Sequence, residues 1–109
     1  MARAKKSQIR EQIKQDLTDQ LERQGVYGQH FLDLIEDYMA LWDTKNALIK
    51  DIKERGVSVK YQNGANQWGY KKNDSVSELV KVNAQMLKIL GELGLRAADF
   101  EADSDDDEE

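Results

Sequence analysis

The 109-residue sequence contains no cysteine and no proline, and it has a single histidine. Without cysteine the chain has no disulfide, no thiolate zinc site and no thiol nucleophile. The absence of proline suits long, uninterrupted helices. No apolar run approaches the roughly 20 residues that a bilayer-spanning helix needs, and the first residues lead into no secretory signal. We therefore expect a soluble, cytoplasmic protein of one small domain, with no cofactor and no membrane partner.

Charge is distributed unevenly along the chain. All 16 basic residues but only 13 of the 21 acidic residues precede Asp99, so residues 1–98 carry a net charge of +3 although the whole chain carries −5. The first fourteen residues contain five basic residues and one acidic residue. If this segment is helical, most of the basic side chains lie within about 80° of one another around the helix. A cationic cluster favours a polyanionic partner, and the alternative is a solvated terminus. The predicted DNA contacts are Arg3, Lys5, Lys6, Arg10, Lys14, Lys71 and Lys72.

Apolar spacing divides the chain into three segments. Residues 1–25 form a predicted basic helical arm with Ser7 as its N-cap, and residues 26–98 form a helical oligomerisation body. In the body, helices are expected over about 29–55, stopping at Gly56, and over about 74–93, with Asn73 or Asp74 as the N-cap. Gly94 would form a left-handed C-terminal cap on the second of these helices, and Leu95 would fold back on its last turn. Residues 99–109 are wholly acidic or small apart from one aromatic, which predicts a disordered tail.

The two long helices carry stripes of apolar residues with the spacing of helices that pack lengthwise. A helix of about 40 Å is long for so short a chain, which suggests contacts with neighbouring subunits. Asn83 lies in the apolar stripe of the later helix. It either sets the register of a subunit contact or is a partly exposed helix position. Val80 and Leu87 widen the same stripe. The predicted oligomer interface comprises Phe31, Ile35, Tyr38, Trp42, Ile49, Leu79, Asn83, Met86 and Leu90.

Between these helices, residues 57–70 have the pattern of a β-hairpin. Asn63-Gly64 is a preferred two-residue turn, and pairing outward from it sets Tyr61 opposite Asn66, Val59 opposite Trp68 and Val57 opposite Tyr70. This register places apolar residues on one face and polar residues on the other, as a half-buried hairpin requires. We expect Trp68 and Tyr70 to pack against the helices; the alternative is that they contact DNA. The predicted fold is thus mainly α, three helices with a β-hairpin between the second and third.

A catalytic function has one candidate set of residues. His30, Asp33 and Asp37 share a helix face and include the hard ligands that a metal-dependent nuclease needs. That face lies opposite the apolar stripe, and the sequence has no glycine-rich phosphate loop. A solvated charged face is the usual explanation of such a pattern, so we expect no metal site, no catalytic residue and no enzymatic activity.

The order of these features resembles the small subunit of phage terminases of the P27 family. The resemblance covers about residues 31–98, and its most specific part is the sequence Leu-Lys-Ile-Leu-Gly-Glu-Leu-Gly-Leu at 87–95. Family members often have Asn-Pro where this chain has Asn73-Asp74, and a proline near the position of Ala97. The resemblance implies a non-enzymatic ring of eight to ten subunits in the host cell cytoplasm. Such a ring binds double-stranded viral DNA and recruits the large subunit, which holds the ATPase and nuclease.

The acidic tail admits three interpretations: a solubilising segment, a DNA mimic that competes for the basic residues, or a docking peptide for the large subunit. Its only large apolar residue is an aromatic that would anchor such a peptide. The predicted partner-binding residues are Phe100, Asp103, Asp105, Asp106 and Asp107. The alternative function for the whole chain is a small oligomeric helical adaptor that does not bind nucleic acid.

Overall fold

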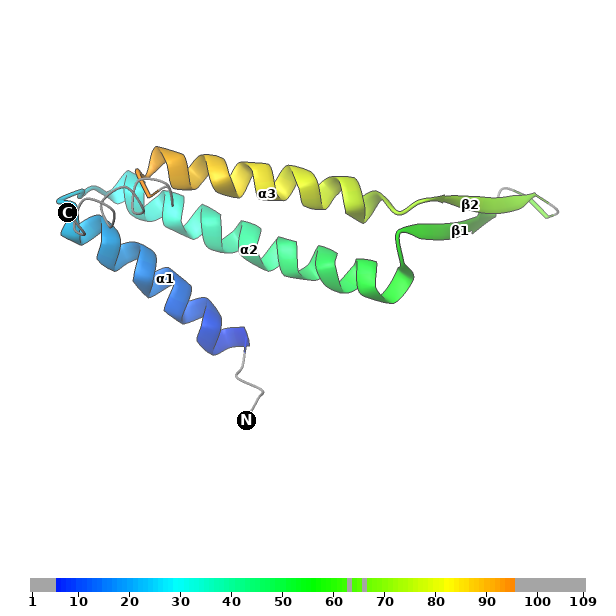
Figure 1. Ribbon diagram of the computed structural model, residues 1–109, viewed down its shortest axis with the longest axis horizontal. Coiled ribbons are helices and arrows are strands. Elements are labelled where there is room, and N and C mark those ends of the chain that lie inside the picture. The colour runs from blue at the N-terminus through cyan, green and yellow to red at the C-terminus, as the bar shows by residue number, and fades with distance from the viewer. Residues whose placement is uncertain (1–5, 63, 66, 96–109) are drawn as a thin grey trace, which may run out of the picture.

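The computed structural model describes residues 6–62, 64–65 and 67–95, and within them the protein is mainly helical. Three helices and a two-stranded antiparallel hairpin follow in the order α1 (Lys6–Arg23), α2 (Gln29–Arg55), β1 (Ser58–Gln62), β2 (Trp68–Lys72) and α3 (Asp74–Glu92) (Figure 1). This architecture is the predicted one, including the place of the hairpin between the second and third helices. Lys6 is already helical, so Ser7 lies inside the first turn of α1 and not at its N-cap.

The C-terminal cap of α3 is confirmed as a Schellman motif. Gly94 has a φ of +75°, and the backbone N–H of Leu95 donates to the carbonyl of Leu90 at 2.8 Å. Leu95 is buried against the core as the motif's hydrophobic contact. The same geometry ends α1 at Gly25, whose φ is +72°. Both helices therefore stop at a glycine that supplies the left-handed conformation needed to turn the chain.

The protein is elongated. Its principal extents are 66 × 30 × 30 Å and its radius of gyration is 19.0 Å, whereas a compact domain of this length has a radius of about 13 Å. Helices α2 and α3 run antiparallel and side by side, and the hairpin continues beyond their common end (Figure 1). Helix α1 meets the pair only at the opposite end, and its other end diverges from them. A single chain consequently has room for only a small core.

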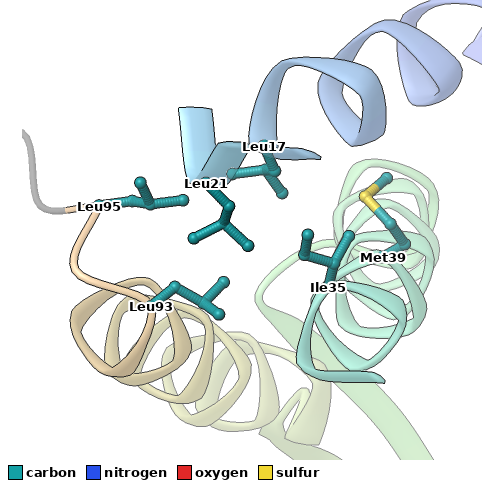
Figure 2. Packing of buried hydrophobic residues seen from close by; sticks show 6 residues of the cluster. All are labelled: Leu17, Leu21, Ile35, Met39, Leu93 and Leu95. Atoms are coloured by element: carbon teal, nitrogen blue, oxygen red, sulfur yellow. The ribbon is translucent and has the colours of Figure 1, made fainter. Parts of the chain in front are cut away.

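The core lies where one end of each helix meets the other two. Its six buried residues come from α1, from α2 and from the C-terminal cap of α3: Leu17, Leu21, Ile35, Met39, Leu93 and Leu95 (Figure 2). The apolar stripe of α1 is therefore only partly used, because Ile13 is half-buried and Ile9 is exposed. Burial falls along α1 in the direction in which the helix diverges from α2.

The hairpin has a different register from the predicted one. Val59 pairs with Lys71, Tyr61 with Gly69 and Gln62 with Trp68, so five residues connect the strands where a two-residue turn was expected. The side-chain amide of Gln62 donates to the carbonyls of Gly64 and Ala65 at 3.0 and 3.3 Å, which supports this longer loop. The predicted register assumed burial of one face. Because the hairpin projects beyond the helices, neither face packs against the core, and burial does not favour the register that separates apolar from polar residues.

Candidate nucleic-acid and subunit interfaces

The hairpin projects from the helical body as an arm, here called the hairpin arm and comprising residues 57–72. Residues 56–73 contain three lysines and no acidic residue. Trp68 is 58% exposed and Tyr70 is 66% exposed, so the prediction that they pack against the helices is wrong. The arm is thus a cationic, aromatic element that its own chain leaves largely uncovered.

The new register places two aromatic and two basic residues of the arm on one face, while Tyr61 lies on the other face. Lys60 lies opposite Tyr70 in the ladder, and its Nζ is 4.5 Å from the ring centroid of Trp68, a cation–π contact. Trp68 and Tyr70 meet edge to face, with their centroids 6.4 Å apart. Lys72 follows on the same face because side chains alternate along a strand. The opposite face carries Lys71.

The base of the arm is fixed by a hydrogen-bond network around the buried side chain of Asn73. This side chain is 0% exposed, and its Oδ1 accepts from the backbone N–H of Ser75 at 2.9 Å, which makes Asn73 the N-cap of α3. Its Nδ2 donates to the carbonyl of Gly56 at 2.9 Å and to Asp51 at 3.0 Å. Its backbone N–H donates to the carbonyl of Val57 at 2.8 Å. One residue thus joins the end of α2, the arm and the start of α3.

The carboxylate of Asp51 completes this network from α2. Arg55 donates to both of its oxygens, at 2.7 and 3.1 Å, and Ser75 Oγ donates at 2.7 Å. The hydrogen bonds from Arg55, Ser75 and Asn73 hold the pKa of Asp51 well below its usual value. Arg55 is four residues from Asp51 on the same helix, but Asn73 and Ser75 are 22 and 24 residues away, and the pairing of α2 with α3 brings them to Asp51.

Two basic residues of α1 face carboxylates of α2. Arg10 forms two hydrogen bonds with Asp43, at 2.9 and 3.0 Å, and Lys14 lies 2.7 Å from Glu36. These ion pairs bridge the two helices where α1 diverges, and the hydrogen bonds lower the pKa of both carboxyl groups. Lys6 is exposed. The remaining predicted contacts of this segment, at positions 3 and 5, lie outside the described residues.

The predicted subunit-contact residues divide by exposure. Ile35 and Met86 are buried within the single chain, so they already serve its own packing. Asn83 is exposed, while the other six are half-buried: Phe31, Tyr38, Trp42, Ile49, Leu79 and Leu90. Their contact with another subunit stays a prediction.

The outer flank of α3 is also apolar. Val80 and Leu87 are 65% and 68% exposed, so they do not widen the packed stripe as the sequence suggested. The two lie seven residues apart and therefore share one side of the helix, with Asn83 between them. Val82, which was not among the predicted contacts, is half-buried. The apolar surface of α3 thus extends beyond the part that its own chain covers.

Within the described part of the chain, the structure gathers no three His, Asp or Glu side chains that would hold a metal ion. His30 stacks on Phe31, with the ring centroids 4.1 Å apart. His30 and Asp33 line a shallow groove between α1 and α2, together with the paired Lys14 and Glu36. No helix among these residues has the length and apolar character to cross a membrane.

A comparison with protein families identifies the chain. The family model described as phage terminase, small subunit, matches residues 11–100, and the chain belongs to this family. Terminase small subunits are non-catalytic regulatory subunits of the phage genome-packaging machinery. No curated protein and no solved structure matches the sequence. The match covers every described helix and strand, apart from the first residues of α1.

Proposed function

We propose that this protein binds double-stranded viral DNA as a ring of eight to ten subunits and recruits and regulates the large terminase subunit. It acts in the host cell cytoplasm, where the packaging motor assembles. Family membership supports the role in packaging. The observation that carries DNA binding is the separation of charge, since the hairpin arm holds exposed lysines in a segment without carboxylates. Lysines that neutralise phosphates release counterions and so bind DNA strongly at low salt.

The DNA contacts come from the arm and from α1. Lys71 and Lys72 lie exposed at the end of β2, and Lys6 lies exposed at the start of α1. Arg10 and Lys14 reach phosphates by exchanging Asp43 and Glu36 for them, which is feasible because both ion pairs are solvent-accessible. Arg3 and Lys5 would extend the same basic segment. A ring repeats each of these weak contacts in every subunit, which raises the overall affinity by avidity.

The elongated shape supports assembly. A chain with so small a core leaves much apolar surface exposed, and exposed apolar patches commonly mark protein contacts. The outer flank of α3, made by Val80, Asn83 and Leu87, is the surface that a neighbouring subunit covers. The partly exposed aromatic residues of α2, Tyr38 and Trp42, extend the contact. Asn83 then sets the register of the subunit interface, as a polar residue within an apolar seam does.

The acidic segment is the site for the large subunit. Phe100 supplies an apolar anchor, and the surrounding carboxylates of Asp103, Asp105, Asp106 and Asp107 select a basic partner surface. In the absence of that partner the same carboxylates compete with DNA for the lysines. Removal of residues 99–109 therefore tightens non-specific duplex binding, and loss of motor stimulation without any change in duplex binding would instead indicate docking alone.

The experiment that tests DNA binding is a salt titration of the full chain with a fluorescent 30-base-pair duplex. The double variant Lys71→Gln/Lys72→Gln removes two phosphate contacts per subunit, which lowers the affinity and reduces the slope of log K against log salt by about 0.9 per lost contact. The control variant Lys88→Gln removes an exposed lysine from α3 and keeps the wild-type slope. A wild-type protein that ignores the duplex at low salt would point to the adaptor function instead.

The subunit contact is tested separately. Leu87→Glu places a charge on the apolar flank of α3. Burial of an unpaired charge at an interface has a large desolvation free energy, so we expect this variant to dissociate, seen as a lower mass in light scattering. Gln85→Glu places the same charge on the opposite exposed flank of the helix and leaves the assembly intact. Equal oligomer masses for both variants would remove this flank from the interface.

A further inference from the structure

The aromatic side chains on this face of the hairpin arm stay largely exposed in the described part of the chain. Trp68 and Tyr70 are more than half exposed, although tryptophan and tyrosine bury large areas in most contacts. A two-stranded hairpin is only marginally stable alone, and these strands join no other strand of the described residues. Exposed aromatic residues on such an element are therefore placed for contact with another molecule.

The chemistry of this face suits a nucleic acid. Trp68 and Tyr70 each combine a flat apolar ring with a hydrogen-bond donor, and Lys60 is held against the Trp68 ring. Rings contact sugars and bases, while the neighbouring lysines neutralise phosphates. No carboxylate lies within residues 56–73 to repel a polyanion.

The shape of the arm favours a duplex. A two-stranded β-ribbon fits the major groove of B-DNA, which is about 12 Å wide. Lysines project from both faces of the ribbon, since Lys60 and Lys72 lie on one face and Lys71 lies on the other. Phosphates line both walls of a groove, and Lys60 and Lys72 lie on different strands of the same face, so their cations flank the rings toward the two walls.

The arm is also held in a fixed direction. The hydrogen bonds of Asn73 to Gly56, Asp51 and Ser75 anchor both ends of the hairpin to α2 and α3. An anchored contact element loses little conformational freedom on binding, which favours affinity. The arm extends beyond the helices, so a duplex can reach it without meeting the helical body (Figure 1).

We propose that the face of the hairpin arm formed by Lys60, Trp68, Tyr70 and Lys72 enters a groove of duplex DNA. This inference rests on the proposed DNA binding and adds the element and the residues that make the groove contact. Trp68 and Tyr70 touch the sugars and base edges, and Lys60 and Lys72 touch the flanking phosphates. The double variant Trp68→Thr/Tyr70→Thr keeps residues that favour strands and lowers duplex affinity at least about fivefold, the low end of the effect of one aromatic–base contact.

The test uses the fluorescence of the full-length protein, which has two tryptophans, Trp42 and Trp68. Duplex binding is followed by anisotropy of a labelled 30-base-pair DNA, and the protein's own emission is recorded in parallel. We expect the duplex to quench or shift the emission of the wild type and of Trp42→Phe. Trp68→Phe, which retains a ring in the arm, should bind the duplex without that change.

The outcomes separate this inference from the proposed function. Duplex binding that leaves Trp68 emission unchanged would refute the groove contact while DNA binding stands. Absence of any duplex binding would refute both. A synthetic peptide of residues 99–109 serves as the second probe. If that peptide changes Trp68 emission and the duplex does not, the arm binds the acidic segment of the chain and the DNA assignment is wrong.

Discussion

Replacement of Asn73 by alanine tests the junction between the helical body and the hairpin arm. Asn73 is the buried N-cap of α3, and its side-chain amide donates to Asp51 and to the carbonyl of Gly56. Alanine removes the cap acceptor and both donors, and it leaves the carbonyl of Gly56 without this partner. The backbone hydrogen bond from residue 73 to Val57 is retained.

The expected loss of stability follows from these contacts. Loss of an asparagine N-cap costs about 1 kcal/mol, and each of the two lost hydrogen bonds that the side-chain amide donates contributes about 1 kcal/mol. The 3.2 Å hydrogen bond from the exposed Arg55 to Oδ1 adds little. The free energy of unfolding should therefore fall by about 3 kcal/mol, a large part of the 5–15 kcal/mol that is typical of small proteins. Asn73→Ser keeps a cap acceptor but is too short to span to Asp51 and Gly56, so we expect about half of that loss.

The assay is urea unfolding followed by helical circular dichroism, with all variants at one protomer concentration because assembly contributes to stability. Ser77→Ala is the matched control, since Ser77 is exposed and donates only to the carbonyl of Asp74 within the same helix. The control should stay within about 0.5 kcal/mol of the wild type. A loss of less than about 1 kcal/mol in Asn73→Ala would show that the network does not hold the junction.

Three further predictions concern the core, a cap and acid stability. Met39 is 0% exposed, so Met39→Ala should lower the free energy of unfolding by about 2–5 kcal/mol in the same urea assay. Gly94→Ala places a Cβ at a φ of +75° and should lower the melting temperature through a cost of about 1 kcal/mol. The pKa of Asp51 is lowered on folding, so its contribution is present above its unfolded pKa near 4 and is lost as the pH falls below that value. The wild type should therefore lose stability between pH 5 and pH 2 more steeply than Asp51→Asn, as followed by thermal melts.

The helices were predictable because their signals are local. Glycine follows each helix within two residues, and α2 runs from Gln29 to Arg55, as its apolar spacing and Gly56 predicted. Asn73 caps α3, and Gly94 with Leu95 ends it, because both motifs need only residues within one turn. The partners of the caps were not predictable. Asp51 meets Ser75 only because α2 and α3 pack together, and their separation of 24 residues leaves no local pattern.

The register of the hairpin was not predictable from the residue pattern alone, because that pattern does not say whether one face of the hairpin is buried. Asn63-Gly64 and the alternating residues indicated the right elements, but the register followed from the assumption that one face is buried. The structure shifts the pairing and thereby places Trp68 beside Lys60. A segment of 18 residues with three lysines and no carboxylate indicates contact with a polyanion, but only the last two of these lysines were predicted to contact DNA.

The predicted interface residues show a related limit. An apolar stripe indicates that a helix face is covered, but it does not say whether the cover is the same chain or another one. Ile35 and Met86 are covered by their own chain, whereas Val80 and Leu87 stay exposed. Only the arrangement of the three helices separates these two groups.

The most direct test of the central claim is native mass spectrometry of the full-length protein, alone and with a duplex from the phage genome. The account predicts one closed oligomer of eight to ten subunits that takes up duplex DNA, and Leu87→Glu should shift it to smaller species. A monomer or dimer that takes up no duplex would contradict the account.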